Sequence, residues 1–190
     1  VHQLRVSTRR AMSVLEIFAE MLPPKKRSWF RRRLKHVRRA AGDARDLDVL
    51  ADRLQKIAEA DDSPACRALI ERVQSARKAA QQPIVAIYEK LMDRNFPKRV
   101  KRLVKKTRWR DPRTDAPRFS VFARRGIAPV ASTFFNAASA DFGNIEALHQ
   151  FRIIGKQLRY SIEVFAAAFG SSFRDEVYPV VEQLQAMLGE

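Results

Sequence analysis

The sequence predicts an all-α protein, and composition, periodicity and length each support this class. Only 6 of the 190 residues are Gly, whereas the good helix formers Ala, Leu, Arg, Lys and Glu are plentiful. Apolar residues recur at steps of three and four, the spacing of one face of a helix, and no segment shows the alternation typical of a strand. A chain of this length is most simply a single domain, residues 1–190, with its own apolar core.

The first expected helix begins at the N-terminus and carries an apolar stripe that must face a neighbour. The stripe consists of Leu4, Ala11, Leu15, Phe18 and Leu22. The consecutive Pro23 and Pro24 should end this helix, because proline lacks the backbone N–H and its ring clashes with the preceding turn.

The next two expected helices meet near Gly42. One covers about residues 26–41, with Gly42 in the position after the helix that favours glycine. The other opens at Arg45, with Asp46 and Asp48 in its first turn, where the helix dipole favours acids. These two carboxylates lie about 200° apart around a helix, so they cannot hold one metal ion together.

Prolines also indicate helix boundaries in the remainder of the chain. Ser63 followed by Pro64 combines a cap with a proline at the first helical position, and this pair predicts the start of a fourth helix. Pro83 is expected to kink that helix. Pro97 opens a short, very basic helix to about residue 107. The last segments are a loop over 107–117 and helices over about 118–140, 145–169 and 173–188.

Positive charge is concentrated in two parts of the chain, and the net charge is +16. Residues 1–53 contain 14 Lys and Arg against 6 Asp and Glu, and residues 94–125 contain 13 against 2. The other two stretches, 54–93 and 126–190, are neutral and slightly acidic. Such an excess repels itself, and a polyanion would relieve the repulsion. The composition therefore predicts nucleic acid, an acidic membrane surface or a phosphate polymer as partner.

Two further observations bear on the cellular location. Cys66 is the one cysteine in the sequence, which excludes an internal disulfide and fits a reducing cytoplasm. No apolar run approaches the roughly 20 residues needed to span a bilayer. The expected location is therefore the cytoplasm, without a membrane span.

A repeat relates the two ends of the chain. The segment from Val1 to Val6 returns, 147 residues later, as the segment from Leu148 to Ile153. The same offset pairs Arg9 with Lys156, Leu15 with Ile162, Glu16 with Glu163, Ile17 with Val164, Phe18 with Phe165 and Gly42 with Gly189. A repeat that keeps both apolar and basic positions predicts two related half-structures, about 1–125 and 126–190, that face one shared site.

The basic positions of the repeat form a stripe on each helix. His2, Arg5 and Arg9 fall within an arc of about 60°. The second copy contains His149, Arg152, Lys156 and Arg159. Successive donors are about 5–6 Å apart, and the guanidinium fork suits phosphate oxygens. The alternative is an ordinary solvated basic surface, which the recurrence of the stripe at a fixed offset disfavours.

On these residues the chain resembles the conserved histidine α-helical domain family, called CHAD. The first motif is His2-x-x-Arg5-Val6-x-x-Arg9-Arg10 with Phe18 downstream, the second is Gly42-x-x-Arg45-Asp46-Leu47-Asp48-Val49, and the third is Leu148-His149-x-x-Arg152-Ile153-x-x-Lys156-x-x-Arg159-Tyr160. The three motifs stand in the family's order and cover most of the chain.

The resemblance implies two pseudo-symmetric helical bundles that enclose a basic groove or pore, and binding of inorganic polyphosphate without catalysis. Some relatives are joined to a triphosphate tunnel hydrolase and others associate with polyphosphate granules. The contacts that the resemblance implies are His2, Arg5, Arg9, Lys35, Arg39, Arg45, His149, Arg152, Lys156, Arg159 and Tyr160.

The chain departs from the family pattern at three points. Met12 and Gln157 replace basic residues that are common in relatives, and each removes one expected contact. The chain also ends at Glu190, where relatives continue into another helix. Either the chain is a fragment or its second half is short.

The sequence contains no phosphate loop, nucleophile elbow or ligand set with metal spacing, so we expect neither an enzyme nor a metal or cofactor site. Nucleic acid is the alternative partner, because it is attracted to any basic helical surface. Single-strand binders add exposed aromatic rings on which bases stack. The candidates here are Trp29, Trp109 and Tyr160. Polyphosphate has no bases and is the expected ligand, with nucleic acid as a weaker competitor; the oligomeric state stays open.

Overall fold

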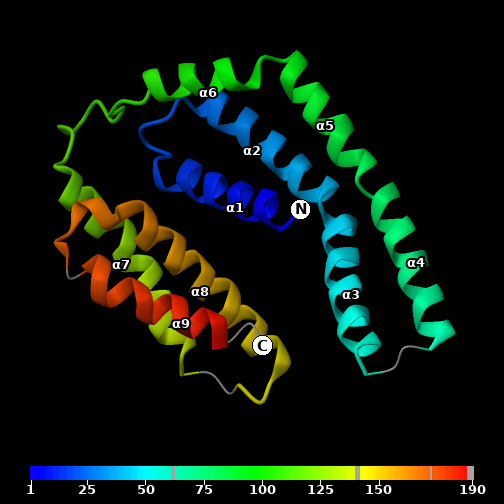
Figure 1. The fold of residues 1–190 in the computed structure, drawn as a ribbon. Coiled ribbons are helices and arrows are strands. Elements are labelled where there is room, and N and C mark those ends of the chain that lie inside the picture. The colour runs from blue at the N-terminus through cyan, green and yellow to red at the C-terminus, as the bar shows by residue number, and fades with distance from the viewer. Residues whose placement is uncertain (61–62, 140–141, 172, 188–190) are drawn as a thin grey trace. The chain divides into compact units, whose positions relative to one another are not determined.

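The protein is all-α, as the sequence predicts (Figure 1). The computed structural model describes residues 1–60, 63–139, 142–171 and 173–187, and within these ranges the regular structure is entirely helical. In the same ranges no helix is long and apolar enough to cross a membrane. The chain divides into two compact units. Unit 1 comprises Val1–Leu15 and Ala19–Arg108, and unit 2 comprises Glu16–Phe18 and Trp109–Glu190.

Unit 1 contains the first six helices. They are α1 (His2–Ile17), of which the last two residues belong to unit 2, α2 (Pro24–Ala40), α3 (Gly42–Ala58), α4 (Pro64–Ala79), α5 (Gln82–Asp93) and α6 (Phe96–Lys105). The most extensive packing joins α3 to α4, which run side by side in opposite directions, and α2 lies along α5 (Figure 1). The Ser63 hydroxyl caps α4 as predicted, accepting a hydrogen bond of 3.2 Å from the N–H of Cys66.

The first helix is shorter than the apolar stripe predicts, because α1 ends at Ile17 and not near Leu22. Two prolines explain the difference. The residue before a proline avoids the helical region, and the proline ring clashes with the carbonyl four residues earlier. Pro23 and Pro24 therefore unwind the turn in front of them, and Pro24 becomes the first residue of α2.

The junction between α2 and α3 also differs from the prediction. Gly42 is the first residue of α3, and its φ is not positive, so it does not end α2 in the left-handed conformation. Ala41 makes the turn instead, with φ −88° and ψ 4°. Because α3 begins three residues earlier than expected, Asp43 and not Asp46 or Asp48 is the acid of its first turn.

Pro83 separates two helices and does not kink one. It lies in the first turn of α5, after α4 has ended at Ala79. A proline in the first turn costs no hydrogen bond, since the N–H groups there have no helical partner. The predictions of a basic helix after Pro97 and of a loop from about residue 107 are confirmed by α6 and by the segment that follows it.

Unit 2 contains the last three helices around an apolar core. They are α7 (Phe119–Ala137), α8 (Ile145–Phe165) and α9 (Tyr178–Met187), with one 3-10 turn at Ala166–Ala168 and one π-helical turn at Phe173–Val177. The core consists of Phe134, Phe151, Leu158 and Ile162, against which residues of α7 and α9 pack. The expected helices over 118–140, 145–169 and 173–188 thus correspond to real elements. The predicted partner of Gly42, Gly189, lies outside the described residues, as do residues 140, 188 and 190.

The unit boundary falls between Arg108 and Trp109, whereas the repeat places the division between halves near residue 125. Residue 125 lies inside α7. The two divisions rest on different criteria, namely contacts between residues in one case and the sequence offset in the other.

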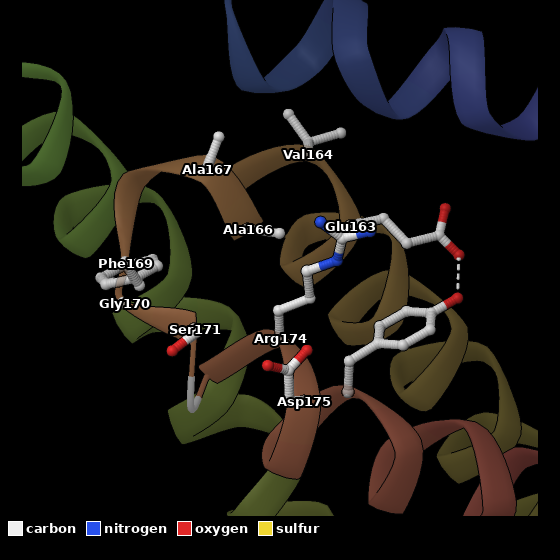
Figure 2. A pocket seen from close by; sticks show the side chains of 10 residues that line it. Glu163, Val164, Ala166, Ala167, Phe169, Gly170, Ser171, Arg174 and Asp175 are labelled. Carbon is white, nitrogen blue, oxygen red and sulfur yellow. Dashed lines mark hydrogen bonds between the residues drawn. The ribbon is translucent and has the colours of Figure 1, made fainter.

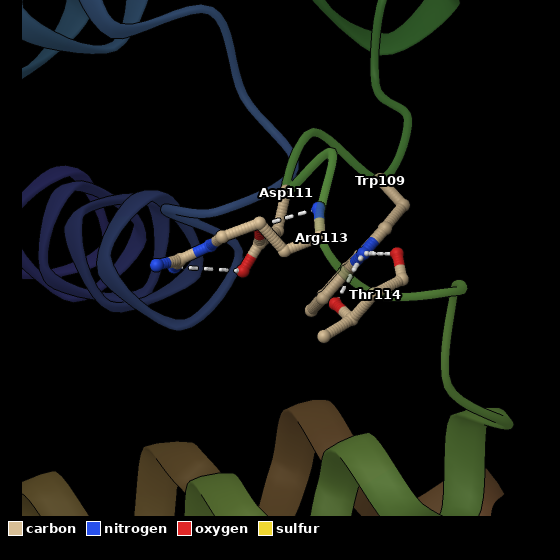
Figure 3. A network of polar contacts seen from close by, with 4 residues as sticks. All are labelled: Trp109, Asp111, Arg113 and Thr114. Atoms are coloured by element: carbon tan, nitrogen blue, oxygen red, sulfur yellow. Dashed lines mark hydrogen bonds and ion pairs between the residues drawn. The ribbon is translucent and has the colours of Figure 1, made fainter.

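The loop that opens unit 2 is ordered by its own side chains (Figure 3). The indole N–H of Trp109 donates to the carbonyl of Thr114 at 2.9 Å. Arg113 forms a two-point ion pair with Asp111, at 3.1 Å and 3.2 Å, and its backbone N–H also donates to that carboxylate. These hydrogen bonds lower the pKa of Asp111 below its usual value. The loop therefore neutralises one of its own cations.

A second apolar cluster in unit 2 surrounds Phe165, the last residue of α8, which is completely buried. Its ring centroid lies 5.8 Å from that of Phe122, 6.1 Å from Phe119 and 6.2 Å from Phe18. Gly126 of α7 faces this ring so closely that a Cβ there would come within 2.7 Å of it. Phe18 and Phe165, which the repeat pairs in sequence, are thus in contact.

We expect Phe165→Ala to lower the free energy of unfolding by about 3–5 kcal/mol, because the substitution removes a fully buried ring and leaves a cavity among aromatic neighbours. Urea unfolding followed by circular dichroism measures the change. Phe135→Ala is the control, since the Phe135 side chain is 68% exposed and its loss should cost far less. Equal losses in the two variants would contradict the assignment of Phe165 to the core.

Candidate functional site

Arg5, one residue of the α1 stripe, connects that helix to the junction between α2 and α3. His2 is exposed, whereas Arg5 and Arg9 are half-buried. One Nη of Arg5 donates to the carbonyl of Ala41 at 3.5 Å, and Ala41 is itself completely buried. A guanidinium carries five N–H donors, so this single contact leaves most of the donors of Arg5 available for a ligand.

The candidates on α2 and α3 have different surroundings. Lys35 and Arg39 are exposed on α2, and Arg39 lies in its last turn, where the helix dipole favours a cation. Arg45 of α3 is half-buried and lines a cleft of about 580 Å³ beside α4. The cleft is polar and of mixed charge, because Asp48 and the α4 residue Arg77 form an ion pair in its wall.

The stripe of α8 begins one turn inside its helix. Asn144 caps α8 by accepting hydrogen bonds from the N–H groups of Glu146 and Ala147, at 2.8 Å and 3.3 Å. Along the helix, His149 is exposed, and the next three stripe residues are half-buried: Arg152, Lys156 and Arg159. The cations of this stripe therefore have stems that pack against protein while their helix is fixed at its start by a cap.

The last two α8 candidates belong to a polar network. Tyr160 is only 5% exposed, and the Arg159 guanidinium lies 4.9 Å from the centre of its ring. An Nη of Arg159 also donates to a carboxylate oxygen of Glu163 at 3.2 Å, and the same oxygen accepts from the Tyr178 hydroxyl at 2.9 Å. Burial and the adjacent Glu163 raise the pKa of the Tyr178 phenol. Glu163 therefore offsets part of the Arg159 charge.

Beside this network, unit 2 has a cavity of about 590 Å³ (Figure 2). Figure 2 shows the Glu163–Tyr178 hydrogen bond at its edge, with Arg174 and Asp175 among the labelled side chains. Two acids and one cation line this cavity together with small apolar residues. Its charge does not suit a polyanion, and no stripe cation lines it.

The three aromatic candidates for base stacking are all engaged in contacts. Tyr160 is buried, and the Trp109 indole is bonded to Thr114. Trp29 of α2 is half-buried, and the guanidinium groups of Arg33 and Arg99 lie 5.4 Å and 5.0 Å from its ring centre. These rings do not form the row of free platforms on which a single strand stacks.

The structure also shows two charge partners that the sequence interpretation missed. Glu163 follows Arg159 by four residues, and this spacing is a known signal for a helical ion pair that could have been recognised. Arg77 of α4 pairs with Asp48 of α3, 29 residues earlier in the sequence, and no local sequence pattern predicts this ion pair. Within the described ranges, no three His, Cys, Asp or Glu side chains gather as a metal site would require.

Comparisons with known proteins agree with this arrangement. The chain is 28% identical over 198 aligned residues to an uncharacterised protein of Mycobacterium tuberculosis strain CDC 1551, and it matches an uncharacterised protein of a second strain to the same extent. Each alignment covers the whole chain but only 37% of the relative, so the chain spans just over a third of these proteins. The profile of the CHAD domain matches residues 1–190. With helices throughout and the family's basic motifs on α1 and α8, the chain belongs to the CHAD domain family.

Proposed function

We propose that the protein binds inorganic polyphosphate through the cationic stripes of α1 and α8 and that it does not catalyse a reaction itself. The observation that carries this proposal is that four cations at equivalent positions of the repeat are buried to a similar degree. Arg5 and Arg9 on α1 are half-buried, and so are Arg152 and Lys156 on α8. A basic surface that serves only solubility does not require half-buried cations at equivalent positions of two helices.

Partial burial strengthens an electrostatic site. Charge–charge attraction increases as the effective dielectric constant falls, so a phosphate oxygen gains more from a half-buried guanidinium than from one in open water. The Arg5–Ala41 contact, at 3.5 Å, is long for a hydrogen bond and contributes weakly to the orientation of the guanidinium. Lys35, Arg39 and Arg45 add charge from α2 and α3, and His2 and His149 add ring N–H donors.

Polyphosphate fits these surroundings better than a nucleic acid strand does. Each phosphate carries charge, and donors 5–6 Å apart along a helix can follow such a chain. A strand of DNA or RNA would leave most of its bases without stacking partners, since Tyr160 is buried, Trp109 is engaged within its own loop and Trp29 is a single ring. Nucleic acid remains the second candidate, as a weaker competitor for the same charges.

The proposal concerns residues 1–190. The relatives are much longer than the chain. The proposal assigns binding to the chain, and it leaves any catalytic activity to a separate domain. A cytoplasmic location, with association to polyphosphate granules, is the setting in which such a binding module would serve.

We expect the protein to bind long-chain polyphosphate more tightly than single- or double-stranded DNA of matched charge. Titration calorimetry at two salt concentrations measures both affinities. Both should fall as salt rises, because counterion release then contributes less. Binding of DNA that is equal or tighter would overturn the polyphosphate assignment in favour of nucleic acid.

Arg5→Ala and Arg152→Ala should each weaken polyphosphate binding by about 1–3 kcal/mol, the contribution of a charge-assisted hydrogen bond in a partly desolvated site. Arg113→Ala is the matched control, because its guanidinium is already paired with Asp111. Circular dichroism should show that all three variants fold. If they lose the same small amount, binding is a diffuse effect of net charge and the stripes are not the site.

Glu163→Gln should raise the affinity for polyphosphate about two- to five-fold, the range expected when a partly exposed ion pair is removed. The amide can still accept from Tyr178, but it no longer offsets the charge of Arg159. Glu89→Gln makes the same charge change at an exposed acid of α5, outside the α8 network, and it should have a smaller effect. Similar gains in both variants would show that only net charge matters.

A further inference from the structure

Unit 1 has a second concentration of cations, where α2 meets α6, and this one has an aromatic floor. Trp29 and Phe30 of α2 pack against Phe96, the first residue of α6. The ring centroids are 4.9 Å apart for Trp29–Phe30, 6.1 Å for Trp29–Phe96 and 5.3 Å for Phe30–Phe96. Phe30 is buried, so Trp29 rests on a fixed support.

One cation of this junction is fixed in advance. The guanidinium of Arg99 lies 5.0 Å from the centre of the Trp29 ring. Its Nε donates to the carbonyl of Arg94 at 2.8 Å. These contacts orient the plane of the guanidinium. The hydrogen bond to Arg94 uses Nε, so the Nη atoms take no part in it. A group held in this way loses little freedom when it binds an anion.

The junction also has space for a ligand. A cavity of about 260 Å³ is lined by Lys25, Lys26, Trp29, Phe30, Arg99 and Arg102. The lining includes four cations and no acid. A second hollow of about 360 Å³ shares Arg99 and Arg102 with the first, and its other lining residues are Asp93, Arg94, Asn95 and Lys98. We call the first of these spaces the aromatic–cationic cavity.

We propose that the aromatic–cationic cavity binds a nucleoside polyphosphate. The base would stack on the guanidinium plane of Arg99, which itself lies over the Trp29 ring, since bases stack on guanidinium planes as they do on aromatic rings. The phosphates would lie among Lys25, Lys26 and Arg102. Bare polyphosphate has no planar apolar part to stack on this guanidinium, whereas a nucleotide has both a base and phosphates for the lining.

The size of the cavity selects a single nucleotide over a strand. It is near the lower end of small-molecule sites, and Trp29 is its one large aromatic platform. A strand needs several platforms in succession. The proposal is independent of polyphosphate binding by the stripes, because the aromatic–cationic cavity and the stripes have no residue in common.

The first test is titration calorimetry with ATP, tripolyphosphate and adenosine, in EDTA so that no divalent cation competes for the phosphates. ATP should bind at least about tenfold more tightly than tripolyphosphate, the gain expected from one stacked base. In a Trp109→Phe background, ATP should quench the fluorescence of Trp29. Equal affinities for ATP and tripolyphosphate would overturn the proposal, and so would a single-stranded oligonucleotide that binds this site more tightly than ATP.

The second test locates the site. Trp29→Leu, and separately Arg99→Gln combined with Arg102→Gln, should weaken ATP binding about tenfold or more and leave long-chain polyphosphate binding nearly unchanged. Lys101→Gln is the control, because Lys101 is an exposed cation of α6 that does not line the cavity. The double Arg variant keeps the aromatic support, so the proposal can be tested even if Trp29→Leu does not fold. If Arg5→Ala and Arg152→Ala weaken ATP binding and the cavity variants do not, ATP binds at the stripes and the proposal is wrong.

Discussion

Mutual repulsion among cations is the constraint on which the rest of this structure depends. The sequence has 37 Lys and Arg against 21 Asp and Glu, and a helical fold must bring many of them close together. The structure lowers this cost locally by several means. Arg113 is paired with Asp111, Arg77 with Asp48 and Arg159 with Glu163, and two guanidinium groups lie over the ring of Trp29. A large excess of positive charge remains after these contacts, and a polyanion is what would neutralise it.

The fold is predictable from local sequence wherever a local cause decides it. Prolines and a cap fix the starts of α2, α4 and α6. The Ser63 cap and Pro97 predict the starts of α4 and α6, whereas Pro24 predicts only the end of the first helix, and the expected start of α2 is about residue 26. Gly42 was misinterpreted because a glycine after a basic helix usually has a left-handed conformation, whereas Ala41 makes the turn in this protein. Tertiary packing around Ala41, which no short window of sequence contains, decides between the two.

The candidate site divides in the same way. The stripe positions follow from helical periodicity and the repeat, because one helix fixes the angles between its own residues. What surrounds each cation does not follow. The contact of Arg5 with the Ala41 carbonyl spans 36 residues, and the burial of Tyr160 depends on how α8 packs. Sequence therefore indicates which residues share a face, and only the structure shows which of them are already neutralised or engaged.

The surroundings of a cation also decide which anion it suits. In electrostatic terms the basic faces of this protein are alike, since each attracts any polyanion and each is weakened by salt. They differ in the atoms beside the charge. Along α1 and α8 the aromatic ring that lies beside a stripe cation, Tyr160 next to Arg159, is buried, so it offers a ligand no free face. At Trp29 the neighbour is a half-buried aromatic ring supported by Phe30 and Phe96, and an anion without a planar apolar group cannot stack beside it. Under the two proposals, a single basic domain would distinguish long polyphosphate from a nucleotide, because selection at Trp29 would rest on the apolar surface that the ligand covers.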